Sequence, residues 1–356
     1  MGRPIEQLAR RALAAAIAAP ILVGVAAHAT RAAEDAVGTF VVQDENDYFT
    51  GTDRHYTQGI RLSYLATARA TPEWVKRLPD IPAFIDAGRG SREDRRIGFV
   101  IGQSIFTPQD TDKRALIASD RPYAGWLYIG GSLQTRYRDR SGVTRLDVLA
   151  FEIGVVGPAA NAEYVQNEFH EIIRSNRVNG WDNQLRNEPA FLLAFERKWK
   201  SSILRLDDGR GRLALGLDAI SHVGFTGGTL HTHAAAGLTL RFGNHLPNDF
   251  GPPRIRPASP GSQSFEPPDS PRNFRWYLFA GFETRLVGRN IFLDGNTFRS
   301  SHSVEKNPIV TDLRLGLATV LFDKVRLTYT YVLRSPEFRG QRGPDQFAAI
   351  SLSVRF

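Results

Sequence analysis

The chain of 356 residues carries a formal net charge of +8, is 42% hydrophobic and contains no cysteine. The lack of cysteine excludes disulfide bonds and thiolate catalysis. A net positive charge is compatible with binding to nucleic acid or anionic lipid, or with solubility alone. Because no nucleic-acid-binding motif occurs and aromatic residues do not interleave with a basic run, we expect no nucleic-acid partner.

The N-terminal residues form a separate unit. Arg3 and Arg10 precede an apolar run, Ala12–Ala29, that ends in a small-residue cleavage motif. This pattern predicts a secretory signal peptide over residues 1–33 and a mature domain over residues 34–356. An N-terminal anchor helix is the alternative, although the run is short for a membrane span, and no later stretch approaches the roughly 20 apolar residues that a spanning helix needs.

The mature chain is dominated by period-two alternation in segments of about ten residues. In the last segment, FAAISLSVRF, Ile350 and Leu352 alternate with Ser351 and Ser353. Such alternation is typical of a soluble sheet with its apolar face inward or of a membrane barrel with that face outward. The small, polar and charged residues of the second face, the signal peptide and the terminal aromatic Phe356 favour an outer-membrane barrel.

We predict an all-β fold: a transmembrane barrel of about twelve antiparallel strands, an even number as this class requires. Two long connections, 67–94 and 243–273, are rich in proline and glycine. The expected strands are 38–49, 56–66, 95–106, 123–136, 143–156, 188–199, 212–223, 229–242, 274–287, 308–321, 324–334 and 346–356.

One connection is predicted to contain a short amphipathic helix. In AEYVQNEFHEIIRSN, Val165, Phe169, Ile172 and Ile173 share one helical face. We expect this stripe to pack against the barrel rim or wall, with His170 at its border.

An even-stranded barrel has both termini on the periplasmic side, so the connections after odd-numbered strands are extracellular. The chemically dense segments then gather at one rim: the first hairpin tip, residues 107–122 and residues 157–187. At the first tip, Asp53, Arg54 and His55 are interpreted as solvated turn residues.

Five motifs in order resemble the outer-membrane lipid A 3′-O-deacylases. They are ENDYFTGTDRHYTQGIRLSY, GQSIFTPQDTDKR, DRPYAGWLY, GVVGPAANAEYVQNEFHEII and GWDNQLRNEPAFLLAFER, and they span Glu45–Arg197. The resemblance implies a twelve-stranded barrel that hydrolyses the ester of the 3′-linked acyl chain and depends on calcium. It also implies a site between the barrel wall and a helix of an outer loop.

The resemblance also implies roles for five residues. Asn46 and Asp47 match the Asn-Asp pair of the first strand, Thr57 the Thr of a Tyr-Thr-x-Gly motif, Lys113 a basic residue after a Thr-Pro turn, and His170 the His of the loop helix. His170, Lys113, Thr57 and Asn46 are therefore the expected catalytic residues. Asp47 and Asn46 are the expected ligands of Ca²⁺.

These residue types suit ester hydrolysis. A neutral His is the usual base near neutral pH, and calcium prefers oxygen ligands and can polarise an ester carbonyl. Lys113 could hold a lipid phosphate or assist the oxyanion. We expect His170 to activate water, with no acyl-enzyme; Glu171, Asp182 and Glu188 are the candidates for orienting it.

The location and partners follow from this interpretation. We expect a monomer in the bacterial outer membrane, with its active site facing outward toward lipid A or lipopolysaccharide and surrounded by outer-membrane lipids. Two alternatives stay open. An outer-membrane phospholipase would need a Ser nucleophile, and the sequence contains no Gly-x-Ser-x-Gly motif that would indicate one. A non-catalytic porin or receptor would keep His170 and Asp47 apart.

One difficulty concerns the predicted calcium ligands. Asn46 and Asp47 are adjacent, so in a regular strand their side chains point to opposite faces. Both can serve one site if the strand bends or ends there.

Overall fold

The computed structural model describes residues 38–50, 55–78, 91–138, 143–206, 215–252 and 272–356. The predicted signal peptide, residues 1–33, and the turn residues Asp53 and Arg54 lie outside these ranges. Among the described residues, no helix is long and apolar enough to cross a membrane.

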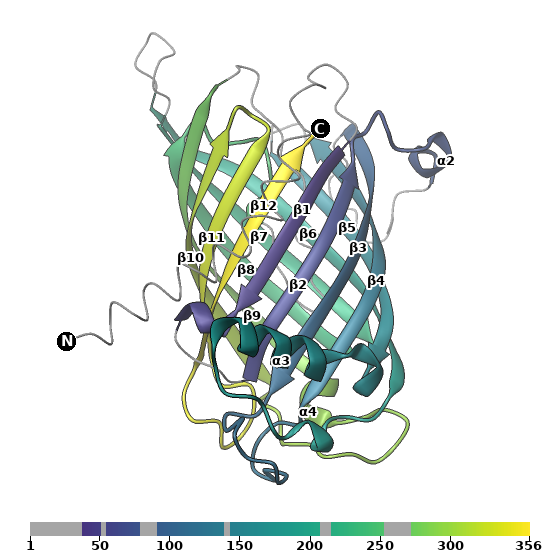
Figure 1. Ribbon diagram of the computed structural model, residues 1–356. Coiled ribbons are helices and arrows are strands. Elements are labelled where there is room, and N and C mark those ends of the chain that lie inside the picture. Colours follow the sequence, from purple (N-terminus) through teal and green to yellow (C-terminus); the bar gives the residue numbers. More distant parts are fainter. Residues whose placement is uncertain (1–37, 51–54, 79–90, 139–142, 207–214, 253–271) are drawn as a thin grey trace, which may run out of the picture.

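The strands close into an antiparallel barrel in which each strand pairs with its sequence neighbours and β1 pairs with β12 (Figure 1). The predicted twelve-stranded barrel is therefore confirmed. Its strands are β1 Gly38–Asn46, β2 His55–Ala66, β3 Ser91–Thr107, β4 Ala124–Arg138, β5 Thr144–Val156, β6 Glu188–Leu206, β7 Leu215–Gly228, β8 His231–Asn244, β9 Phe274–Asn290, β10 Ile309–Leu321, β11 Val325–Arg334 and β12 Asp345–Arg355.

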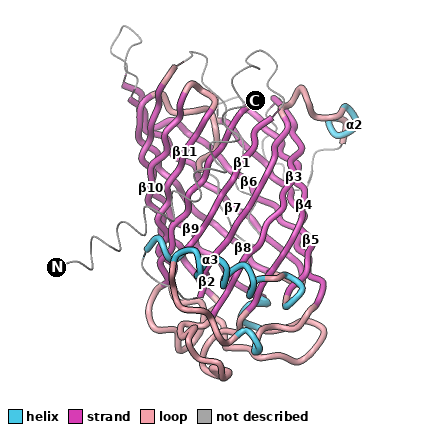
Figure 2. The backbone as a smooth tube through the Cα atoms, viewed as in Figure 1, coloured by secondary structure: helices cyan, strands magenta, loops and turns pink. Residues whose placement is uncertain are grey.

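The short helices lie in the connections between strands (Figure 2). Two α-helices, α3 (Ala162–Ile173) and α4 (Ile291–Asp294), lie at the end of the barrel opposite the C-terminus, which we call the helix end. The other end, called the terminal end, carries α2 (Glu73–Lys76) outside the wall. Three 3₁₀ helices, η2 Asp47–Thr50, η4 Pro158–Ala160 and η5 Trp181–Asn183, complete the described helices.

The two faces of the wall follow the alternation in the sequence. Large apolar side chains such as Ile101, Ile129 and Leu315 point outward and are about half exposed. The alternating positions carry buried polar and charged side chains that point into the lumen. This is the apolar-out pattern of a membrane barrel, where lipid covers the outer face.

The lumen is filled with ion pairs, as buried charges require. Arg61 pairs with Glu152 at 3.1 Å, His222 with Glu283 at 2.9 Å and Arg334 with Asp312 at 2.9 Å. The side chains of these pairs are all less than a tenth exposed.

Both ends of the lumen are occupied by connecting segments. At the helix end, Phe292 of α4 is fully buried and stacks on Phe106 with ring centroids 3.9 Å apart. At the terminal end, the chain after β8 turns inward, so that Asp249 contacts Arg241 and lies 2.6 Å from Arg326. Its neighbour Phe250 packs in a buried apolar cluster with Val148. Side chains of the connecting segments therefore occupy both ends of the lumen.

Candidate functional site

Helix α3 lies against the outside of the barrel at the helix end, across neighbouring strands of the wall (Figure 1). A Cβ atom placed on Gly125 of β4 would lie 2.4 Å from the Cβ of Ala162, so glycine permits this close approach. Gln103 of β3 donates a hydrogen bond of 2.6 Å to the carbonyl of Ala160, just before α3. The expected position of the helix, against the wall, is observed.

The face of α3 that packs includes only part of the predicted stripe: Val165 packs against a buried apolar cluster that includes Tyr123 and Trp181. Ala162, Gln166 and His170 are buried, at the spacing of one helical face, whereas Ile172 of the predicted stripe is 50% exposed. On the outside of a membrane barrel lipid can cover an apolar side chain such as Ile172, so polar residues of the helix can pack against protein.

The buried polar face of α3 is held by specific hydrogen bonds. Gln166 Oε1 accepts a bond of 3.0 Å from the indole N–H of Trp181 in η5. His170 Nδ1 lies 2.6 Å from the carbonyl oxygen of Asn176. Because a carbonyl only accepts, Nδ1 carries the proton in this contact, and the neutral ring presents Nε2 as an acceptor.

This contact identifies the carbonyl of Asn176 as the group that orients His170, and it was not among the predicted candidates. The carbonyl of Asn176 belongs to the turn directly after α3, where Arg174 has φ +55°. Of the predicted candidates, Asp182 pairs with Arg114 at 3.4 Å, and Glu188 accepts the backbone N–H of Thr297 at 2.8 Å. A backbone carbonyl leaves no side-chain motif by which it could be found.

The Asn46–Asp47 pair lies where the first strand stops. Strand β1 ends at Asn46, earlier than the predicted residue 49, and η2 begins at Asp47. Asn46 Oδ1 accepts the N–H of Tyr48 at 2.8 Å, and this contact starts the turn. Both side chains are buried, 2% exposed, and because the regular alternation ends between them, adjacency no longer forces them to opposite faces.

The structure places the turn after β1 beside helix α3 on the wall. The ring of Tyr48, next to Asp47, contacts the ring of Phe169, next to His170, edge to face with centroids 6.4 Å apart. The Asn46–Asp47 turn and the helix that carries His170 are therefore neighbours on the wall.

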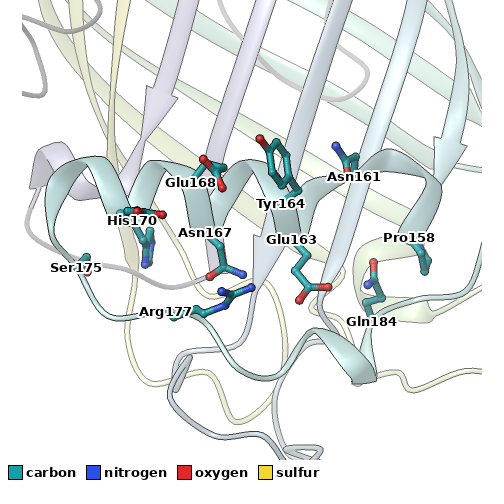
Figure 3. A pocket seen from close by; sticks show the side chains of 11 residues that line it. Pro158, Asn161, Glu163, Tyr164, Asn167, Glu168, His170, Ser175, Arg177 and Gln184 are labelled. Atoms are coloured by element: carbon teal, nitrogen blue, oxygen red, sulfur yellow. The ribbon is translucent and has the colours of Figure 1, made fainter.

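A cavity of about 520 Å³ adjoins α3 and includes His170 in its lining. Figure 3 shows His170, Asn167 and Arg177 directed into the space between the helix and the returning loop. Three carboxylates, from Glu163, Glu168 and Glu171, also line it. The cavity is thus polar and open to solvent on one side of a histidine that is itself 5% exposed.

The oxygen atoms near Asn46 are of the kind that a hard cation such as Ca²⁺ prefers as ligands. Asp44 lies two residues before Asn46, on the same outward face of β1, and among the described residues its Oδ1 is buried without a hydrogen-bond partner. Such an atom is a free donor for a cation. Within the described part of the chain, however, no three His, Asp or Glu side chains converge to hold a metal. A calcium ion here would therefore also need amide, carbonyl, water or substrate oxygens.

Thr57 and Lys113 have different surroundings. Thr57 is buried at an irregularity in the β2–β3 pairing, and its Oγ1 lies 2.8 Å from Thr107 Oγ1. Lys113 is exposed, pairs with Asp110 at 3.1 Å and lines a second cavity, of about 560 Å³, that does not include His170. The structure thus brings the Asn46–Asp47 turn beside α3. Among the described residues, however, neither this pair nor Lys113 lines the cavity that includes His170.

His55 is not the solvated turn residue that was expected. It is 1% exposed, its Nδ1 lies 2.5 Å from Asp345, and its Nε2 lies 3.5 Å from Asp120. It begins β2 with φ +67° and ties that strand to β12 and to the second loop. The interpretation as a turn residue was wrong because its partners are distant in sequence.

A family described as outer membrane protein LpxR matches residues 13–356 of the sequence. The chain belongs to the LpxR family. The predicted membership of the outer-membrane lipid A 3′-O-deacylases is thereby confirmed, and the chain is an outer-membrane lipid A deacylase.

A solved LpxR structure has the same fold. LpxR from Salmonella typhimurium superposes with a TM-score of 0.65 at 20% identity, covering 89% of this chain and 100% of that chain. The β domain of the Bordetella autotransporter BrkA reaches a TM-score of 0.44 at 12% identity, covering 90% of this chain and 100% of that one. No curated protein matches the sequence.

Proposed function

We propose that this LpxR-family barrel hydrolyses the ester of the 3′-linked acyloxyacyl chain of lipid A in the outer leaflet, using water activated by His170 and depending on calcium. The helix end then faces outward, and the protein acts as a monomer. The observation that carries the proposal is the contact between α3 and the Asn46–Asp47 turn on the outer wall, the face that lipid covers in a membrane barrel.

In the proposed reaction the chain's own groups position a proton acceptor. The carbonyl of Asn176 holds the Nδ1 proton of His170, so Nε2 can take a proton from water as the water attacks the ester carbonyl. The proton then passes to the leaving alkoxide, which yields a free acid and an alcohol. The cavity beside α3 provides a route for that water.

Calcium would be held by Asp47 and Asn46, with Asp44 as a further oxygen donor. When bound, it would supply Lewis-acid stabilisation of negative charge on the ester oxygen. Lys113, in the neighbouring loop, would act on a phosphate of the bound lipid rather than on the reacting ester. Thr57 would support the turn region through Thr107.

The test is mass spectrometry of lipid A from outer membranes that carry the protein. Loss of the 3′-linked chain is expected with wild type and calcium, and a chelator should abolish it. His170→Gln should lower the rate by about 10²-fold or more, the usual contribution of a general base. His302→Gln is a matched control, because His302 also contacts a loop carbonyl, that of Asp120 at 2.6 Å.

The outcomes separate the parts of the proposal. Unchanged lipid A with folded wild type and calcium would refute the deacylase function, and cleavage of phospholipid instead would support the phospholipase alternative. Full activity of His170→Gln would refute the assigned base, and activity in excess chelator would refute calcium dependence.

A further inference from the structure

Two helices border the lipid-facing surface of β4. At its start, Gly125 lies under Ala162 of α3. Ten residues later, Thr135 accepts a hydrogen bond of 3.2 Å from Arg95, which also donates to the carbonyl of Val75 in α2. Figure 1 shows these helices at opposite ends of the wall. The outward residues between them are Leu127, Ile129, Gly131 and Leu133.

The depth of these residues can be estimated from strand geometry. Ten residues at about 3.4 Å each and a tilt of about 40° span about 26 Å, which matches the apolar band of about 25 Å on such barrels. Gly131 is six residues from Gly125, so it lies about 15 Å below α3 by the same geometry, a little past the middle of the membrane.

Gly131 interrupts an aromatic row at that depth. It pairs with Phe99 on β3 and with Phe151 on β5, whose side chains point outward and are 55% and 44% exposed. In the two rows nearer α3, Leu127 and Ile129 occupy the equivalent positions. Because neighbouring strands are about 4.8 Å apart, the missing side chain leaves a gap one strand wide between two aromatic walls.

The backbone does not require glycine at this position. A Cβ on Gly131 would meet just one atom within 4 Å, the carbonyl oxygen of Gly98 at 3.7 Å, which is an ordinary contact. The preceding Gly130 is different, because a Cβ there would lie 2.5 Å from the carbonyl oxygen of Phe151. Packing explains Gly130, whereas Gly131 has room for a side chain that the sequence does not use.

We propose that the gap at Gly131 receives the distal end of the acyl chain that is cleaved, so that Phe99, Gly131 and Phe151 determine the longest chain accepted. This inference rests on the proposed function. A lipid whose ester lies at α3 extends its chain along the wall toward the membrane midplane, and a leaflet of about 15 Å ends at the depth of the gap. An acyl chain held between these aromatic rings exchanges its contacts with mobile lipid chains for contacts with protein side chains.

The test is a competition between two lipid A species that differ in the length of the 3′-linked chains, mixed in the same vesicles. Gly131→Leu should lower the cleavage rate of the longer species about 10-fold relative to the shorter, within the discrimination that apolar pockets achieve. The rate on the shorter species should stay at the wild-type level.

Gly227→Leu is the matched control. Gly227 also continues an outward-facing series, on β7 after Val223 and Phe225, and a Cβ on it would meet nothing within 4 Å. Gly227→Leu should leave the ratio of the two cleavage rates, longer species to shorter, unchanged. An unchanged ratio in a folded, active Gly131→Leu variant would overturn the inference alone, whereas a wild-type protein that cleaves neither species would overturn the proposed function.

Discussion

Asp120 is a loop residue whose charge is stabilised by contacts from several segments. Burial raises the pKa of its carboxyl group, but hydrogen bonds from His55 and from the backbone N–H groups of Gln109 and Arg121 outweigh burial. The net result is a pKa below its ordinary value of 3.8. A carboxyl group with a lowered pKa stabilises the fold above its ordinary pKa, and that stability is lost as the pH falls through the folded value.

Asp120→Asn should therefore lower the thermal midpoint of the folded barrel at pH 7 and have a much smaller effect at pH values well below 3.8. The midpoint can be followed by circular dichroism in detergent at both pH values. An equal fall in the thermal midpoint at both pH values would show that the side chain of Asp120 acts through packing rather than charge.

Residues of this kind mark a limit of sequence interpretation. Asp345 lies 290 positions from His55, so local composition gave no reason to expect a buried pair. His170 could be singled out because it lies in a recognisable motif. The carbonyl of Asn176 could not, since every residue has one.

At the scale of elements, α3 determines how the site is built. The face with Ala162, Gln166 and His170 packs on the wall together with Val165, and Ile172 of the apolar stripe stays exposed. The helix itself was predictable from periodicity, but which face packs depends on whether the solvent is water or lipid. The strands were predictable because alternation persists along each one, and the early end of β1 was not, because the Asn46 turn interrupts it.

Gly125→Ala should weaken the contact between α3 and the wall, because the new methyl group would lie 2.4 Å from the Cβ of Ala162. We expect deacylase activity to fall about 10-fold or more, as misplacement of a catalytic group does, while the barrel stays folded. Faster proteolysis within residues 157–187 would report release of the helix. Gly227→Ala is the control, and wild-type activity and protease resistance in Gly125→Ala would contradict this account.

At the scale of the whole molecule, the barrel is filled from both ends. Phe292 lies in the helix end, and Asp249, between Arg241 and Arg326, lies in the terminal end. Ion pairs such as Arg61–Glu152 fill the space between. Strand number and alternation predicted the barrel, but they do not tell whether a lumen is open.

The wild-type protein should therefore show no steady single-channel conductance in planar lipid bilayers. Buried ion pairs in the lumen, with connecting segments at both of its ends, occupy the space that an ion path would need within the described part of the chain. Recordings at moderate salt, with an open porin as the positive control, would check this. A reproducible ohmic step would contradict a closed lumen.

The position of α3 on the outer wall has a kinetic consequence. A substrate that reaches His170 from the surrounding lipid arrives by lateral diffusion, so the encounter rate depends on how many lipid A molecules occupy each unit of membrane area. In detergent the same enzyme would respond to the mole fraction of lipid A within the micelle. Adding detergent at constant lipid A would slow the reaction by surface dilution, as for an interfacial enzyme, although the bulk concentration of substrate is unchanged.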